Sequence, residues 1–182
     1  MTSRLDHLWA GWRSSYIESV TAGDEVIAAP QDPPAGPGSL FERILALPDD
    51  EGYVVHRGAR CSTLLNAYPY TNGHVLVMPN AAVAELDDLD DATHDELWRE
   101  VRAAVAAIRA AYSCDGVNVG LNLGRAAGAG VPEHLHVHAM PRWSGDTNFM
   151  TSVAETRVMP EPLGTSFTKL RAAWSLLAPP VR

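Results

Sequence analysis

Cysteine is scarce in this chain of 182 residues: Cys61 and Cys114 are the only two, and they lie far apart. Neither a disulfide framework nor a four-cysteine zinc site can be built from them. Long apolar runs are also missing: none approaches the ~18 residues of a membrane-spanning helix, and no signal-peptide apolar segment follows Met1–His7. We therefore expect a soluble, cytoplasmic protein without a membrane partner.

Positive charge is likewise in short supply. The 14 Lys and Arg residues stand against 22 Asp and Glu residues, which gives a formal net charge of −8. A nucleic-acid backbone is bound by a face rich in Lys and Arg, so we expect no nucleic-acid partner. Small anionic ligands stay open, because backbone N–H groups can hold phosphate without side-chain charge.

The length and the mixture of residues are those of one folded domain. Hydrophobic residues make up 46% of the chain and charged residues 20%, which excludes wholesale disorder. We expect a single domain over 1–182. It consists of an N-terminal extension over 1–38 that ends in the Pro- and Gly-rich segment Pro30–Gly38, a core over 52–143 and a C-terminal extension over 144–182.

Two helical patterns and several short β-type runs indicate the fold class. Thr93 and Glu96 form a capping-box pattern ahead of apolar residues at helical spacing, which predicts a long helix over 93–112. A second helical pattern covers Leu163–Leu177. Runs bounded by Gly, Pro or Asn predict strands at Tyr53–Val55, Cys61–Leu65, His74–Met78, Val117–Leu123 and His134–Met140. The expected fold is α+β, an antiparallel sheet with one long helix packed on it and a C-terminal helix.

Three of the seven histidines stand at alternate positions: His134, His136 and His138. Successive side chains of a strand point to opposite faces, so the three imidazoles would share one face while Leu135 and Val137 point into the core. A lone histidine is most often structural, but three polar rings on one face indicate a functional site. Two chemistries compete here. Three histidines can bind a catalytic zinc ion, or one imidazole can act as a nucleophile with the others as hydrogen-bonding partners.

A Gly- and Ala-rich loop over 124–130 leads into the three histidines. It is not a P-loop, because no Gly-Lys-Ser/Thr occurs. Its glycines allow backbone N–H groups to approach an anion closely. The loop and the histidines together indicate a phosphate held beside a nucleophile, which favours the nucleophile over the zinc ligand set.

The segment His-Leu-His-Val-His-Ala-Met over 134–140 resembles the His-φ-His-φ-His-φ-φ signature of the histidine triad family of nucleotidyl hydrolases and transferases, in which φ is apolar. The upstream segment 65–77 (LNAYPYTNGHVLV) is similar to the family's Asn-x-x-Pro…Gly-His segment. The flanks 8–13 and 145–150 are similar to one branch, which contains the bacterial diadenosine tetraphosphate phosphorylases, or ATP adenylyltransferases.

The resemblance implies a role for each matching residue. His136 matches the nucleophile that attacks an α-phosphate, and His134 matches the residue that orients the nucleophilic ring. His138 and His74 match histidines that contact the phosphate and support the nucleophile, and Asn66 matches a residue that bonds the ribose hydroxyls. The phosphate-binding segment of the family matches Asn122, Gly128, Ala129, Gly130 and Val131.

Two features of the family are replaced in this sequence. Many bacterial members hold a structural zinc ion with a Cys-x-x-Cys and a histidine. The matching positions here carry Ser39, Glu42 and Ala82, so we expect no metal. The usual Gln-Ser/Thr before the triad is replaced by Gly130-Val131, which leaves phosphorolysis and hydrolysis both open.

The resemblance implies an enzyme that acts on an adenine (di)nucleotide. The preferred version is phosphorolysis of diadenosine tetraphosphate to ATP and ADP through a nucleotidyl-His136 intermediate, with inorganic phosphate as co-substrate and no cofactor. With water as the acceptor, the protein would be a dinucleoside polyphosphate hydrolase or a nucleoside phosphoramidase. From another class, a nucleotide-binding sensor without turnover stays open, as does a divalent-ion requirement. The resemblance also implies a homodimer, with the helix 93–112 or the C-terminal segment at the interface.

Overall fold

The computed structural model describes residues 35–146 and 161–177, so the similarity at 8–13 and most of that at 145–150 lie outside the described residues. The described helices and strands follow one another in the order α2 (Leu40–Leu45), β1 (Val54–Arg57), β2 (Cys61–Leu65), β3 (Val75–Pro79), α3 (Asp91–Tyr112), β4 (Gly116–Leu121), β5 (Val137–Arg142) and α5 (Leu163–Ser175). Two short 3-10 turns, Leu86–Asp88 and Arg125–Ala127, lie before α3 and after β4.

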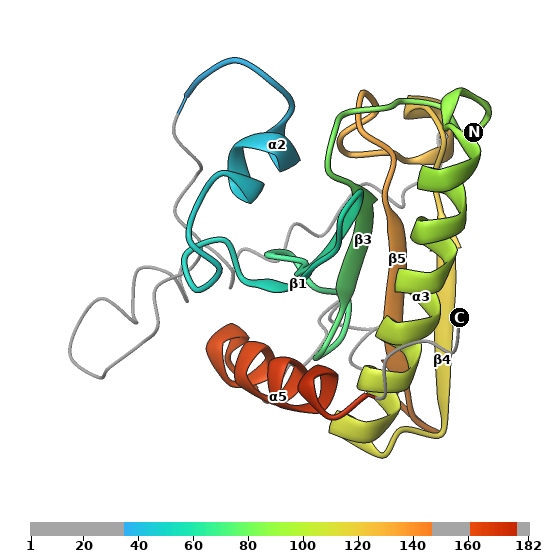
Figure 1. Ribbon diagram of the computed structural model, residues 1–182. Helices are drawn as coiled ribbons and strands as arrows, with labels where there is room; N and C mark the ends of the chain where they lie inside the picture. Colours follow the sequence, from blue (N-terminus) through green and yellow to red (C-terminus); the bar gives the residue numbers. More distant parts are fainter. Residues whose placement is uncertain (1–34, 147–160, 178–182) are drawn as a thin grey trace, which may run out of the picture.

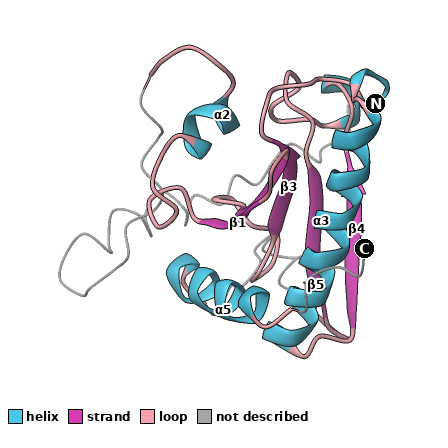
Figure 2. Ribbon diagram, in the orientation of Figure 1, coloured by secondary structure: helices cyan, strands magenta, loops and turns pink. Residues whose placement is uncertain are grey.

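The strands form one five-stranded sheet in the order β1-β2-β3-β5-β4 (Figure 2). Every neighbouring pair is antiparallel, and β5 enters between β3 and β4. The expected α+β fold with an antiparallel sheet is therefore confirmed. His138 on β5 lies opposite Leu76 of β3 and Gly120 of β4, so it is paired on both sides, between the inner strand β3 and the edge strand β4.

The two faces of the sheet are covered by different helices. The main core joins strand residues such as Val137 and Ala139, and Leu135 just before β5, to buried apolar residues of α3 and α5. A smaller cluster on the other face contains Phe41 of α2 together with Val54, Leu64, Leu76 and Met78. In Figure 1, α3 runs along β5 and β4 while α2 lies on the far side of β1 and β3. The sheet thus separates α2 from α3.

The long helix begins earlier than the sequence predicts. Asp90 is its N-cap, because the Asp90 carboxylate accepts from the Thr93 N–H at 2.9 Å. The expected capping box at Thr93 and Glu96 is therefore wrong. Glu96 Oε1 instead accepts from the backbone N–H groups of Arg60 (2.6 Å) and Cys61 (2.9 Å). The carboxylate thus anchors the helix to the start of β2, a partner that the local pattern could not indicate.

The strand of the triad also begins later than expected. β5 starts at Val137, so only His138 of the three histidines lies within it, and His134 and His136 precede it. The alternation still holds, because Leu135 is buried in the main core while His134 and His136 contact Phe41 on the other face. The period of two therefore continues through the residues that precede β5.

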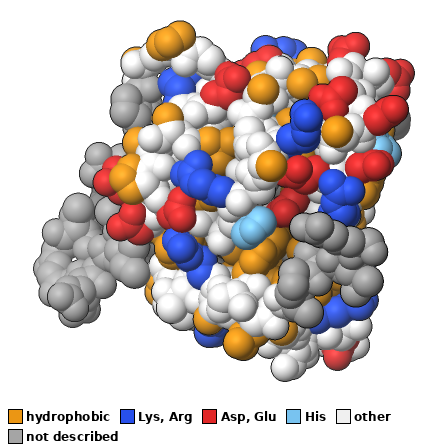
Figure 3. Space-filling view, in the orientation of Figure 1, with side chains coloured by type: hydrophobic (Ala, Val, Ile, Leu, Met, Phe, Trp, Pro, Cys, Tyr) orange, Lys and Arg blue, Asp and Glu red, His pale blue; other side chains and the backbone are white. Residues whose placement is uncertain are grey.

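Charges of both signs are mixed on the surface of the described residues. Lys and Arg side chains lie among Asp and Glu side chains on the face drawn in Figure 3, and the described residues form no continuous basic stripe there. None of the helices in residues 35–146 and 161–177 combines the length and the apolar character that crossing a bilayer requires.

Candidate active site

The three histidines of the triad lie together on the face of the sheet that α2 covers. His134 is fully buried, His136 is buried and His138 is half-buried. The ring centroids of His136 and His138 are 5.0 Å apart, and the edge of Phe41 contacts His136 at 4.9 Å and His134 at 5.4 Å. The structure therefore brings the three rings to one place, as the alternation predicts.

His136 has one engaged ring nitrogen and one available for chemistry. Its Nδ1 lies 2.9 Å from the carbonyl oxygen of His134. A carbonyl oxygen only accepts, so Nδ1 carries the hydrogen, and the lone pair of the neutral ring is on Nε2. An imidazole held in this tautomer presents a nucleophilic nitrogen.

His134 has both ring nitrogens engaged. Its Nε2 lies 2.8 Å from the carbonyl oxygen of Pro79, and its Nδ1 lies 2.6 Å from the hydroxyl oxygen of Ser39. Since the carbonyl accepts, Nε2 carries the hydrogen and Nδ1 accepts from the Ser39 hydroxyl. Both nitrogens are thereby unavailable to a ligand. This arrangement removes His134 from a three-histidine zinc site and favours the nucleophile hypothesis.

His74 and His138 form a directed pair. The backbone N–H of Tyr70 donates to His74 Nδ1 at 3.1 Å, so the hydrogen of the neutral ring is on Nε2. His74 Nε2 then donates to His138 Nδ1 at 2.9 Å, which leaves the hydrogen of His138 on its own Nε2. His138 therefore has a hydrogen-bond donor on Nε2, and the fully buried His74 fixes this tautomer.

Two further residues stabilise this pair. The amide nitrogen of Asn66 lies 3.3 Å from His74 Nδ1, and its oxygen accepts from the Tyr68 N–H at 2.9 Å. The ring of Tyr70 stacks on His138 with a centroid distance of 5.9 Å. Asn66 thus lies beside the site, and its contact with ribose stays a prediction.

The loop that precedes the triad offers backbone donors at two positions. The Gly128 N–H donates to the Arg125 carbonyl and the Ala129 N–H to the Gly124 carbonyl, which closes the loop on itself. The N–H groups of Gly130 and Val131 make no hydrogen bond within the described chain.

Asn122 lies next to this loop. A Cβ added at Gly128, where φ is +92°, would lie 3.8 Å from its amide nitrogen. The expected phosphate segment is therefore assembled ahead of the triad, with Gly130 and Val131 as its available donors. Phosphate binding there stays a prediction.

Burial keeps the four histidines neutral. Desolvation, together with the smaller effect of the neighbouring imidazoles, lowers the pKa of His74 to about 3 and that of His138 to about 4. Desolvation also lowers the pKa values of His134 and His136 below the usual 6.5. At neutral pH the ring of His136 is thus unprotonated, as a nucleophilic imidazole would have to be.

The lowered pKa values predict a pH-dependent stability. Below pH 6.5 the unfolded chain binds protons at its histidines while the folded chain does not, so the free energy of unfolding falls as the pH drops toward the folded pKa values. We expect this free energy, measured by urea unfolding, to fall steadily between about pH 7 and pH 5, a window above the carboxylate titrations. A constant value across that window would contradict the neutral buried cluster.

Ser39, Glu42 and Ala82, the three positions that the resemblance relates to zinc ligands, are joined by hydrogen bonds in this protein. Glu42 Oε2 accepts from the Ser39 N–H at 2.7 Å, and Glu42 Oε1 accepts from the Ala82 N–H at 3.1 Å. Among the residues that the structure describes, no group of three or more His, Cys, Asp and Glu side chains is arranged to hold a metal ion. This donor set does not fit zinc.

The expectation of no bound zinc stays a prediction with a direct measurement. Elemental analysis of purified protein is expected to give far less than one zinc ion per chain, because serine, one carboxylate and a backbone N–H do not make a tetrahedral site. A result of about one zinc ion per chain would contradict it.

The contribution of α2 to this site is not among the features that the sequence predicts. Ser39 and Glu42 stand out there only as replacements of zinc ligands, and Phe41 and Tyr70 do not stand out at all. A signal is present, since Ser39-Leu40-Phe41-Glu42 is a capping-box pattern, and the structure contains that box. Nothing local shows that the cap faces a histidine 95 residues away.

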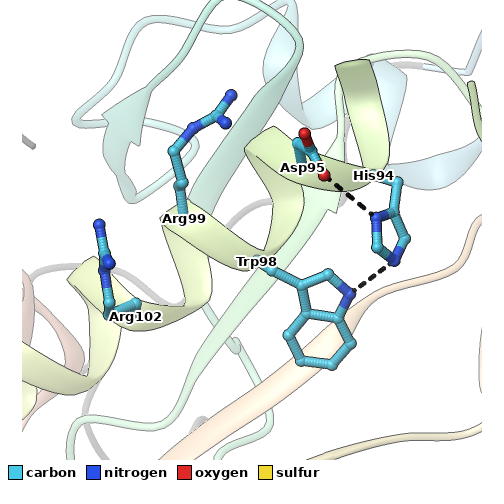
Figure 4. Close-up of a pocket in the computed structure, with 5 residues that line it drawn as sticks. All are labelled: His94, Asp95, Trp98, Arg99 and Arg102. Carbon is cyan, nitrogen blue, oxygen red and sulfur yellow. Dashed lines mark hydrogen bonds and ion pairs between the residues drawn. The ribbon is translucent and has the colours of Figure 1, made fainter. Parts of the chain in front are cut away.

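A concave region lies on the outer surface of α3 (Figure 4). Within it, the Trp98 Nε1–H donates to His94 Nε2 at 3.1 Å, and His94 Nδ1 lies 3.6 Å from an Asp95 oxygen. Arg99 and Arg102 complete the lining. Because α3 covers the sheet face opposite the triad, this region is separate from the histidine site.

Comparison with known sequences identifies the family. The HIT domain model matches residues 49–145. The AP-4-A phosphorylase of Mycobacterium tuberculosis H37Rv is 38% identical over 172 residues, which are 94% of this chain and 86% of that protein. An asymmetrical bis(5'-nucleosyl)-tetraphosphatase of Schizosaccharomyces pombe is 37% identical over 93 residues, which are 51% of this chain and 50% of that protein.

Solved structures have the same fold. A hypothetical histidine triad nucleotide-binding protein of Sulfolobus tokodaii superposes with a TM-score of 0.57 at 29% identity, over 68% of this chain and 83% of that one. A Zn-bound histidine triad family protein of Mycobacterium smegmatis superposes with a TM-score of 0.57 at 29% identity, over 68% of this chain and 84% of that one. The family match, the relatives and the geometry of His134, His136 and His138 agree, and the chain is an enzyme of the HIT, or histidine triad, family.

Proposed function

We propose that this enzyme cleaves diadenosine tetraphosphate by phosphorolysis to ATP and ADP, with His136 as the nucleophile. The observation that carries the proposal is the hydrogen bond from His136 Nδ1 to the His134 carbonyl, which leaves a lone pair on Nε2 in a ring that is neutral at pH 7 because burial lowers its pKa. The relative with the matching name, AP-4-A phosphorylase, covers nearly the whole chain and supports the choice of substrate.

In the first step, His136 Nε2 attacks the α-phosphorus of one adenosine moiety. A nitrogen–phosphorus bond forms as the bond from that phosphorus to the bridging oxygen breaks, so the enzyme holds AMP and ATP leaves. Negative charge develops on the phosphoryl oxygens and on the departing oxygen. The donors available for this charge are His138 Nε2–H and the N–H groups of Gly130 and Val131.

In the second step, an oxygen of inorganic phosphate attacks the same phosphorus. The nitrogen–phosphorus bond breaks, ADP leaves and the lone pair returns to His136 Nε2. The sum of the two steps is diadenosine tetraphosphate plus phosphate giving ATP plus ADP. Such a double displacement divides one difficult transfer into two easier ones.

The choice of acceptor is tested by product analysis. Enzyme and diadenosine tetraphosphate are incubated with and without inorganic phosphate, and the nucleotides are separated. We expect ATP and ADP only when phosphate is present. AMP and ATP without phosphate would mean a hydrolase, as the name of the Schizosaccharomyces pombe relative says of that protein. Binding without any product would mean a sensor.

The ribose contact of Asn66 gives a separate prediction. If its side chain bonds the ribose hydroxyls, Asn66→Ala weakens AMP binding by roughly 1–3 kcal/mol, because a polar partner is left unsatisfied. Calorimetry with AMP and with its 2',3'-dideoxy analogue checks this. Wild type is expected to prefer AMP, and the variant to bind both equally. A preference for AMP that survives the substitution would remove the ribose role.

A homodimer is part of the proposal. β4 is an edge strand of the sheet, and Val119 on it is exposed. Light scattering of the purified protein is expected to give twice the mass of one chain, and the mass of a single chain would exclude the dimer.

A further inference from the structure

The short helix α2 lies directly against the triad. Its only buried residue, Phe41, contacts the rings of both His134 and His136 edge-on. Its N-cap, Ser39, is 7% exposed and reaches the fully buried His134. A helix of six residues has little intrinsic stability, so its place depends on these contacts.

The hydroxyl of Ser39 is fixed in direction by its partners. It accepts from the Glu42 N–H at 3.2 Å as an N-cap does, and it lies 2.6 Å from His134 Nδ1. The carbonyl of Pro79 already takes the Nε2 hydrogen of His134. The Ser39 hydroxyl hydrogen therefore points to His134 Nδ1, and the buried ring has a donor on one side and an acceptor on the other.

The orientation of His134 reaches the nucleophile through the backbone. The carbonyl oxygen of His134 is the acceptor that holds His136 Nδ1–H. His134 precedes β5, so strand pairing does not fix this carbonyl, and the side-chain bonds of His134 anchor the residue in place. A rotation of His134 would turn its carbonyl and with it the ring of His136.

The helix α2, which carries Ser39 at its start, is itself held in place by hydrogen bonds at both ends. Glu42 accepts from the N–H groups of Ser39 and Ala82, and these backbone hydrogen bonds lower the pKa of its carboxyl, which keeps it ionised. Arg57 on β1 donates to the carbonyls of Leu45 and Leu47 at the other end of α2. Both ends of the helix are thereby held, so the Ser39 hydroxyl has a defined position relative to His134.

We propose that Ser39 is a positioning residue of the reaction. Its hydroxyl holds His134 as the Nε2–H tautomer, and the carbonyl of His134, so oriented, aims His136 Nε2 at the phosphorus. This proposal rests on the function proposed above. If the proposal is right, loss of the Ser39 hydroxyl lowers kcat. If Ser39 were only an N-cap, its loss would lower the free energy of unfolding and leave kcat unchanged.

The test compares variants that separate the hydroxyl from the cap. Ser39→Gly removes the hydroxyl and keeps a residue that is tolerated as an N-cap, and Ser39→Thr keeps the hydroxyl. Asp90→Gly is the matched control, because Asp90 caps α3 on the other side of the sheet. For each protein, urea unfolding, kcat and KM for diadenosine tetraphosphate, and the ¹⁵N shifts of the His134 ring are measured.

We expect kcat of Ser39→Gly to fall by about tenfold with KM unchanged, the size of effect that a small misplacement of a reacting group produces. Its His134 Nδ1 signal is expected to move toward that of a ring nitrogen without a hydrogen bond. Ser39→Thr is expected to keep both the bonded signal and kcat. Asp90→Gly is expected to keep kcat, because this cap lies on the other side of the sheet from the triad.

The positioning role would be overturned by an unchanged kcat in Ser39→Gly, by a change confined to KM, or by an equal fall of kcat in Asp90→Gly. Retention of the bonded signal in Ser39→Thr together with a lost kcat would overturn it as well. The ¹⁵N shifts need no substrate. A wild-type His134 with its hydrogen on Nδ1 would therefore refute the Ser39 bond whatever the reaction is. Wild-type protein that does not turn over diadenosine tetraphosphate but shows the Nε2–H tautomer would refute the proposed function alone.

Discussion

His136→Asn is expected to lower turnover of diadenosine tetraphosphate by a factor on the order of 10⁴–10⁶, the usual cost of removing a nucleophile. The asparagine amide can still donate to the His134 carbonyl in place of Nδ1–H, so the backbone around the site keeps its hydrogen bond. What disappears is the lone pair on Nε2. The variant should therefore fold normally, bind nucleotide and fail to form a covalent bond to it.

Two measurements check this result. Mass spectrometry of rapidly quenched wild-type enzyme is expected to show an added AMP, and the variant is expected to show none. Calorimetry with AMP is expected to give similar affinities for both proteins. If His136→Asn kept about a tenth or more of the wild-type rate, covalent catalysis through this residue would be wrong.

His138→Ala is expected to have the second largest effect, a fall in kcat on the order of 10²–10³, which is the typical cost of one lost donor to a developing oxyanion. The His74 hydrogen bond leaves the hydrogen of His138 on Nε2, and burial keeps the pKa of His138 at about 4. At neutral pH it thus acts as a neutral donor. Steady-state kinetics at saturating substrate measures the loss.

The control and the double variant separate this role from a general effect of histidine loss. His94→Ala removes a histidine on the outer surface of α3 and should leave kcat unchanged. The His136→Asn, His138→Ala double variant should be little slower than His136→Asn alone, because the donor acts on the same transfer. A double variant slower by the full product of both losses would mean that the two residues serve different steps.

Several features of this protein follow from the sequence by itself. The spacing of His134, His136 and His138 places them on one face, because side chains alternate along a strand and the alternation continues through the residues just before β5. The α+β class and the long helix follow from hydrophobic periodicity, which reports a local geometry. The family match rests on the same short motifs. All of these features depend on residues that lie close together in the sequence.

Element boundaries depended on partners distant in sequence. The long helix begins at Asp91 because the Asp90 carboxylate serves as its cap, while the Glu96 carboxylate that the local pattern reserved for a capping box binds the start of β2 instead. The sequence offers two carboxylates, those of Asp90 and Glu96, that could cap the start of this helix. Which of them does so depends on how the helix packs against the sheet.

The chemistry of the triad was likewise decided by the tertiary structure. A neutral histidine in a sequence has two tautomers open to it, and the hydrogen bonds of the folded chain select one. The Pro79 carbonyl and the Ser39 hydroxyl, which lie 55 and 95 residues from His134, occupy both of its ring nitrogens, so neither nitrogen has a lone pair available for a metal ion. The sequence by itself determined which residues meet on the face of the sheet. The fold determined which nitrogen of each ring is free to react, because that depends on donors and acceptors brought together from distant parts of the chain.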